Sequence, residues 1–246
     1  MRLYPAIDIL GENAVRLVKG DFEAKKVYDE DPLAAARGWT RAGARRLHVV
    51  DLDGAKRGEP VNLEHLRRIA GELGVPVQYG GGLRSAEAIA AALGAGAERV
   101  ILGTAAFTDE RLVREALAAH GPERVLASID VRSGRVATHG WLQSTDMRAS
   151  DAFAALRERG LRNFVFTDID RDGMLDGASL GEVLAAASAA MEGSMIYSGG
   201  IGSLADLRAL AALRSEHELD ALAGVIVGKA LYERRFTVAE AHAALQ

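Results

Sequence analysis

Short apolar runs recur along the chain and alternate with longer stretches that have helical periodicity. The runs are mostly aliphatic or β-branched and show little alternation of apolar and polar positions, which is typical of parallel strands buried on both faces. They are RLYPAID (2–8), RLHVVDLD (46–53), VPVQYGG (75–81), RVILGT (99–104), RVLASID (124–130), NFVFTDID (163–170), SMIYSGG (194–200) and AGVIVGK (223–229).

The intervening stretches have the pattern of amphipathic helices. Many begin with Ser, Asp or Asn, which are good N-caps, as in 31–43, 62–74, 85–96 and 203–216, and the first three of these end in Gly. Eight strand–helix units without a flexible linker predict an α/β protein, a (β/α)₈ TIM barrel that forms one domain over residues 1–246. The alternative is a doubly wound open sheet.

Four motifs occur twice in the same order, about half a chain apart. YGGGLRS (79–85) matches YSGGIGS (197–203), PAIDILG (5–11) matches ASIDVRSG (127–134), VVDLDGAKRG (49–58) matches FTDIDRDG (166–173), and VILGTAAF (100–107) matches VIVGKALY (225–232). This order predicts a two-fold repeat of half-barrels, approximately 1–122 and 123–246. Because strands one and five of a closed barrel stand opposite each other, we expect one site with a near two-fold axis.

The composition argues against a nucleic-acid-binding protein and against a membrane-spanning one. The chain has 246 residues, 49% of them apolar and 26% charged, and a net charge of −4. This balance gives no broad basic field for nucleic acid, and no apolar stretch is long enough to span a membrane. The chain has no cysteine, which excludes disulfides and thiol chemistry and fits the cytoplasm. We expect a cytoplasmic monomer that acts on a small molecule.

Glycine pairs follow strands three and seven, and further glycines follow strands four and eight. Each pair alone is compatible with a tight turn, but a duplicated set on adjacent strands favours phosphate binding by backbone N–H groups. The pattern therefore predicts two phosphate sites and a substrate with a phosphate at each end. The predicted sites comprise Gly81, Gly82, Gly103 and Thr104 on one side, and Gly199, Gly200, Gly228 and Lys229 on the other.

Asp8 and Asp130 end strands one and five. A carboxylate after an apolar run is costly to bury unless it is paired or functional, although a strand-end Asp also caps loops. Two carboxylates on opposite faces of one substrate can act as general acid and general base. We therefore predict that these two residues are catalytic.

Further acids follow strands two and six, where they could suggest a divalent metal. The ligand set is incomplete, because His48 is the one nearby histidine and is not expected to face these acids. We expect no metal and no cofactor, and assign most of these acids to loop structure or to contacts with substrate hydroxyls, with Asp168 and Gly173 placed in the substrate site. The acids are Asp51, Asp53, Asp168, Asp170 and Asp172.

Four other residues are candidates. Thr167 can hydrogen-bond substrate or a catalytic Asp, or be an ordinary strand residue. Trp141 can stack on a flat heterocycle or anchor its loop. Arg16 and Lys19 can reach a phosphate or remain solvated charges.

These motifs together resemble the HisA family of histidine biosynthesis, the ProFAR isomerases, over essentially the whole chain. The resemblance implies a (β/α)₈ barrel, a substrate with two phosphoribosyl ends, and an Amadori rearrangement of the aminoaldose ProFAR to the aminoketose PRFAR without metal or organic cofactor. It implies that Asp8 is the general base and Asp130 the general acid that opens the sugar ring. It further implies that Thr167 supports Asp130 or the substrate and that Trp141 stacks on the imidazole carboxamide.

Three alternatives stay open. A bifunctional relative also isomerises phosphoribosylanthranilate, but that group has Arg where this chain has His139. The related imidazoleglycerol-phosphate cyclase usually opens with a Cys-containing stretch, whereas this chain has PAID. The third alternative is a barrel that binds phosphometabolites without catalysis.

Overall fold

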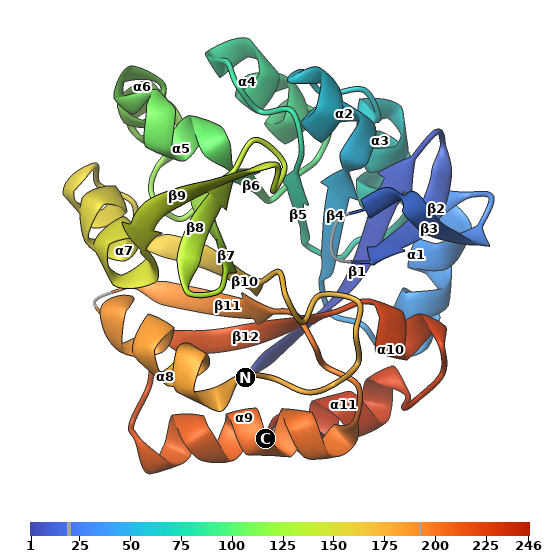
Figure 1. Cartoon of the computed structure of the whole chain (residues 1–246). Coiled ribbons are helices and arrows are strands. Elements are labelled where there is room, and N and C mark those ends of the chain that lie inside the picture. The colour runs from blue at the N-terminus through green and yellow to red at the C-terminus, as the bar shows by residue number, and fades with distance from the viewer. Residues whose placement is uncertain (19–20, 192) are drawn as a thin grey trace.

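Eight parallel strands close into a barrel in the computed structural model, which describes residues 1–18, 21–191 and 193–246 (Figure 1). Each strand pairs with the next, and the pairings of β12 with β1 and of β7 with β10 complete the ring. The predicted (β/α)₈ barrel is confirmed, and an open sheet is excluded. The barrel strands are β1 (Arg2–Leu10), β4 (Leu47–Asp51), β5 (Val77–Gly80), β6 (Arg99–Leu102), β7 (Val125–Arg132), β10 (Asn163–Asp168), β11 (Ser194–Ser198) and β12 (Leu222–Val227).

Helices surround the barrel as an outer ring (Figure 1). Asp31, Ser85 and Ser203 are N-caps whose side chains accept backbone N–H bonds, as the sequence predicts for α1, α4 and α9. The helices are α1 (Pro32–Arg41), α2 (Leu52–Arg57), α3 (Leu63–Leu73), α4 (Ala86–Gly94), α5 (Thr104–Thr108), α6 (Glu110–His120), α7 (Ala149–Glu158), α8 (Leu180–Ala189), α9 (Leu204–Glu216), α10 (Lys229–Tyr232) and α11 (Val238–Ala244).

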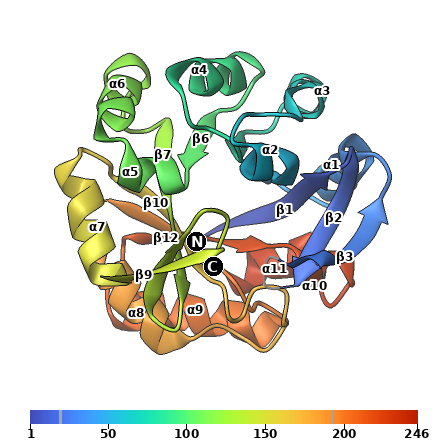
Figure 2. The same cartoon turned by 45° about the horizontal axis from the view of Figure 1, so that its top comes forward.

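Two antiparallel extensions, which the apolar pattern of the sequence did not predict, continue from opposite barrel strands. β2 (Asn13–Val18) and β3 (Asp21–Asp29) continue from β1, while β8 (Arg135–Thr138) and β9 (Gln143–Arg148) continue from β7. Figures 1 and 2 show them as two separate ribbons at the barrel. The sequence of β9, QSTDMR, is polar and mostly exposed and does not resemble a buried strand, whereas that of β2, NAVRLV, is largely apolar.

The apolar core has two parts, divided by the wall of the barrel. A large cluster fills the space between the strands and the helices, and a smaller one lies inside the barrel. Successive side chains of a strand point to opposite faces. In β1, Tyr4 and Ala6 therefore point into the barrel, and Ile7 and Ile9 point toward the helices. Asp8 follows Tyr4 and Ala6 on the inward face.

The two-fold repeat is present in the backbone conformation as well as the sequence. Gly81 and Gly199 have φ angles of 115° and 116°, and Gly82 and Gly200 have φ angles of 72° and 75°. The N–H of Gly11 donates to Asp53 at 2.8 Å, and the equivalent N–H of Ser133 donates to Asp170 at the same distance. The two halves therefore share backbone geometry and hydrogen bonds as well as sequence motifs. The boundary between the halves near residue 122 stays a prediction.

Across the described residues, the helices are too short or too polar for any of them to span a bilayer.

Candidate active site

Asp8 and Asp130 lie on opposite strands of the barrel at matching positions. β1 and β7 are separated by three barrel strands on each side of the ring. Asp8 is in register with Val50 of β4, and Asp130 is in register with Thr167 of β10. Both carboxylates therefore face inward at the carboxyl end of the barrel, where (β/α)₈ enzymes place their active sites.

Asp8 is buried and paired with a buried arginine. Arg16 on β2 donates from Nη1 to Asp8 Oδ2 at 2.7 Å, and its Nη2 lies 3.6 Å from Asp172 Oδ1. Burial raises the pKa of Asp8 to about 6, although the Arg16 charge pulls it down. Asp8 is therefore a carboxylate that titrates close to neutral pH, as a general base should.

Asp130 has hydrogen-bond donors in place of an ion pair. Ser128 Oγ donates to Oδ1 at 2.6 Å, and the indole Nε1 of Trp141 donates to Oδ2 at 2.9 Å. Burial raises the pKa of Asp130, while bonds from Ser128, Trp141 and Thr167 lower it. The removal of any of these donors would favour the protonated acid.

The Trp141 loop reaches Asp130 through an unusual backbone. His139 and Trp141 both have positive φ angles, 55° and 71°, which non-glycine residues seldom adopt. The N–H of His139 donates to Thr104 Oγ1 at 2.8 Å, and Arg132 donates to the carbonyl of Trp141 at 3.3 Å. The loop is thus tied to the end of β6 on one side and to β7 on the other.

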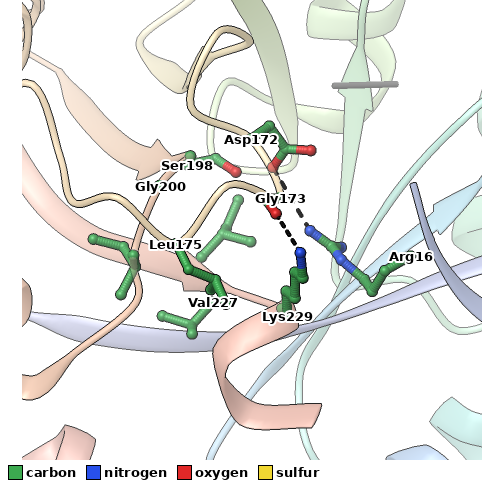
Figure 3. A pocket seen from close by; sticks show the side chains of 12 residues that line it. Arg16, Asp172, Gly173, Leu175, Ser198, Gly200, Val227 and Lys229 are labelled. Carbon is green, nitrogen blue, oxygen red and sulfur yellow. Dashed lines mark hydrogen bonds and ion pairs between the residues drawn. The ribbon is translucent and has the colours of Figure 1, made fainter. Parts of the chain in front are cut away.

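A cleft lies at the ends of β11 and β12 (Figure 3). Lys229 Nζ closes one side by donating to the carbonyl of Gly173 at 2.7 Å. Arg16 lies against Gly228 so closely that a Cβ there would meet its Cζ at 2.4 Å, and no described residue accepts from the buried Arg16 Nε. Two cations thus converge on glycine backbone, which suits an anion. The lining includes Arg16, Asp172, Gly173, Ser198, Gly199, Gly200, Gly228 and Lys229.

The corresponding region of the first half has the same glycine backbone but different polar groups. Gly103 precedes α5 as Gly228 precedes α10, and Thr104 takes the place of Lys229. A Cβ on Gly81 would lie 2.1 Å from the carbonyl oxygen of Asp51, as one on Gly199 would lie 2.6 Å from that of Asp168. Gly81 and Gly199 are therefore required by close backbone packing, independently of any phosphate, whereas a Cβ on Gly103 would meet nothing within 4 Å.

The acids after β4 and β10 are largely structural. Asp51 is fully buried and caps α2, and it accepts from Gly54, Val61, Asn62 and Tyr79. Among the described residues, no cluster of three or more His, Asp or Glu side chains could hold a metal ion. Alternation along β10 turns Asp168 away from the inward face that carries Thr167, so the structure does not bring Asp168 to the cleft, and its carboxylate lies 3.6 Å from Arg171.

The structure adds Ser128 and Ser198, which the motifs did not indicate, and places Asp172, one of the acids expected in loop structure or at substrate hydroxyls, beside Arg16. Asp172 stands with Arg16 in the cleft, Ser128 donates to Asp130, and Ser198 lines the cleft. The repeat held a signal for all three, because the equivalents of Asp172, Ser128 and Ser198 in the first half are Ala55, Ala6 and Gly80. Lys19, a predicted phosphate ligand, lies outside the described residues.

Comparisons with known proteins agree with one another. Residues 2–237 match the family model described as "Histidine biosynthesis protein". A protein of a Picosynechococcus strain is 46% identical over 98% of this chain and 92% of its own length. One from Brevibacillus brevis is 46% identical over 97% of this chain and 94% of its own, and one from Shouchella clausii is 45% identical over 97% and 96%. All three are named 1-(5-phosphoribosyl)-5-((5-phosphoribosylamino)methylideneamino) imidazole-4-carboxamide isomerase.

Proposed function

The chain belongs to the histidine-biosynthesis protein family and is an isomerase, and on this premise we propose that it converts the aminoaldose ProFAR into the aminoketose PRFAR. The reaction is an Amadori rearrangement. It opens the ribose ring at C1, removes a proton from C2 and delivers a ketone at C2. Each of these steps needs a proton transfer that a side chain can perform.

One observation carries the proposal: Asp8 and Asp130 face each other across the barrel mouth at equivalent register positions. A sugar held between them has one carboxyl group on each face. Asp130 protonates the ring oxygen as the C1–O bond breaks and the nitrogen lone pair forms a C1=N bond. Asp8 then removes the C2 proton, and the electron pair becomes the C1=C2 bond of an enolamine, which tautomerises to the ketone.

The surroundings of the two acids fit these different roles. Because the pKa of Asp8 is raised to about 6, it is mostly ionised at pH 7 yet basic enough to accept a proton. Asp130 has a pKa raised by burial, but its three donors favour the ionised form. Substrate that draws the Trp141 indole away from Asp130 and onto the imidazole carboxamide removes one donor. That movement favours the protonated state which a general acid needs.

The two phosphates lie, in this proposal, at the two glycine-lined strand ends. The cleft with Arg16 and Lys229 holds one phosphate, supported by the two cations and by the backbone at Gly199, Gly200 and Gly228. Gly81, Gly82, Gly103 and Thr104 hold the other by symmetry. A substrate that spans these sites places its central sugar between the two aspartates. No metal or organic cofactor takes part.

Conversion of purified ProFAR tests the proposal, followed by the absorbance change or by chromatography of the product. We expect turnover of ProFAR and none of phosphoribosylanthranilate run alongside. Turnover of both substrates would indicate the bifunctional activity, and turnover of neither would leave a binding protein.

A further inference from the structure

Four polar side chains form a chain of hydrogen bonds inside the barrel, below the two catalytic acids. Arg99 Nη2 donates to Tyr4 OH at 2.7 Å and to Gln78 Oε1 at 3.0 Å. The amide nitrogen of Gln78 lies 2.8 Å from His48 Nδ1. These residues come from four adjacent strands, β1, β4, β5 and β6, and all four are buried.

The other half of the barrel is apolar at the equivalent positions. Gln78 is in register with Arg99 and with His48, just as Ile196 is in register with Gly224 and with Val165. Tyr4 likewise corresponds to Leu126. The same layer of the barrel interior is therefore filled by apolar residues in one half and by hydrogen-bonded polar side chains in the other. Since the other half of the barrel closes without such polar groups, the four polar residues need another reason than the fold.

The chemistry of the donors fixes the proton on His48. A guanidinium can only donate, so Gln78 must turn its oxygen toward Arg99 and its NH₂ toward His48. His48 Nδ1 then accepts, and a neutral imidazole must hold its proton on Nε2. Burial, together with the charges of Arg16 and Arg99, lowers the pKa of His48 to about 3, so the ring is neutral near pH 7.

His48 stands one inward position below the catalytic acids. It is in register with Ala6 of β1, whereas Val50, the next inward residue of β4, is in register with Asp8. The charge of Arg16, the partner of Asp8, acts on the ring of His48. No described residue accepts a hydrogen bond from His48 Nε2, although the residue as a whole is only 8% exposed.

We propose that Arg99 and Gln78 are positioning residues that hold His48 with its proton on Nε2, and that this N–H donates to an oxygen of the sugar between Asp8 and Asp130. The inference rests on the proposed isomerase function and adds to it. A neutral imidazole donor suits this place, because it can polarise a developing carbonyl or enol oxygen without bringing a second cation beside Arg16. The hydrogen bonds from Arg99 to Gln78 and from Gln78 to His48 would hold the Nε2–H of His48 in place before substrate binds.

A long-range ¹H–¹⁵N spectrum of the wild-type protein gives the first test, since it distinguishes protonated from unprotonated ring nitrogens. We expect the resonances of His48, assigned by comparison with His48→Asn, to show a protonated Nε2 and an unprotonated Nδ1. A proton on Nδ1, or a doubly protonated ring at pH 7, would overturn the proposal whatever the kinetics show.

Substitution of Arg99 gives the second test. Arg99→Met frees the Gln78 amide to turn, so we expect both tautomers of His48 in the spectrum and a fall in kcat of about tenfold, the effect of one misdirected hydrogen bond. Arg99→Lys keeps a cationic donor and should stay close to the wild type in both readouts. If Arg99→Met does not fold, Gln78→Ile replaces it, because isoleucine already occupies the equivalent position at residue 196.

Ile196→Val is the matched control, since it disturbs packing at the same level in the apolar half. It should lower Tm slightly and leave kcat and the His48 spectrum unchanged. Wild-type kcat in folded Arg99→Met or Gln78→Ile would overturn the positioning role. A wild-type protein that does not convert ProFAR would instead refute the proposed function, and the tautomer measurement would be unaffected.

Discussion

Asp8 and Asp130 occupy equivalent register positions in the two halves of the barrel, yet each is held by a different kind of partner. Asp8 pairs with the guanidinium of Arg16, while Asp130 accepts neutral donors. A charge beside a carboxylate favours its ionised form more strongly than a hydroxyl or an indole does. The symmetric scaffold thus supplies two acids with unlike neighbours, which fits the proposed roles of Asp8 as base and Asp130 as acid.

The pH dependence of kcat/KM follows from Asp8. A base must be ionised, and the pKa of Asp8 is about 6, so activity should be lost as the pH falls through about 6. Arg16→Met removes the charge that lowers this pKa, and the acidic limb should move to higher pH. Arg16→Lys should move it less. An acidic limb near the ordinary value for aspartate, or one that Arg16→Met leaves in place, would contradict the assignment of Asp8.

The glycine motifs make a prediction about stability. Gly81→Ala places a Cβ 2.1 Å from the Asp51 carbonyl oxygen at a φ of 115°, so we expect a loss of at least about 2 kcal/mol of unfolding free energy in urea denaturation. Gly199→Ala should behave alike. Gly38→Ala, which meets nothing within 4 Å in helix α1, is the control and should stabilise by roughly 0.5–1 kcal/mol. Equal stability of Gly81→Ala and the wild type would show that the backbone can move aside.

This packing also changes how the glycines can be used to test phosphate binding. A valine at Gly81 or Gly200 would disturb the strand ends themselves, so a raised KM would not report on phosphate alone. Side chains give a cleaner test.

Lys229→Met should raise KM for the two-phosphate substrate by about tenfold or more, because a charge-assisted hydrogen bond contributes roughly 1.5–3 kcal/mol. The outer-helix control Arg114→Met removes a charge whose side chain is 70% exposed on α6, and should leave KM unchanged. An unchanged KM in Lys229→Met would remove this cleft as a phosphate site.

Metal removal should have no effect on turnover. Asp51, the most buried of the loop acids, already uses its carboxylate oxygens to accept backbone and side-chain donors. After exhaustive dialysis against EDTA we expect the same kcat as before. A loss of activity that Mg²⁺ or Mn²⁺ restores would refute the metal-free mechanism.

The sequence was sufficient to predict the barrel, because each strand is a continuous apolar run and the motifs repeat in order. It also placed Asp8 and Asp130 at matching strand ends. The extensions β2, β3, β8 and β9 were missed, since polar strands such as β9 owe their conformation to pairing with a neighbour. Local pattern cannot show such pairing.

The contacts that distinguish the two acids were missed for a related reason. Arg16 reaches Asp8 because β2 pairs with β1, and Trp141 reaches Asp130 from the loop after β8, so both contacts depend on pairings that local pattern does not show. Differences between the repeats were the available signal. Ala55 stands where the second half has Asp172, and Val50 stands where it has Thr167. Where two halves share a scaffold, such unequal positions are the first candidates for function.

The turnover of Asp8→Asn and Asp130→Asn on ProFAR tests the central claim most directly. Asparagine preserves the shape of each side chain but removes its ability to exchange a proton, so each variant should keep the wild-type circular dichroism spectrum and lose about 10²–10⁴-fold in kcat. Near-wild-type kcat in either folded variant would contradict the account of two opposed acids.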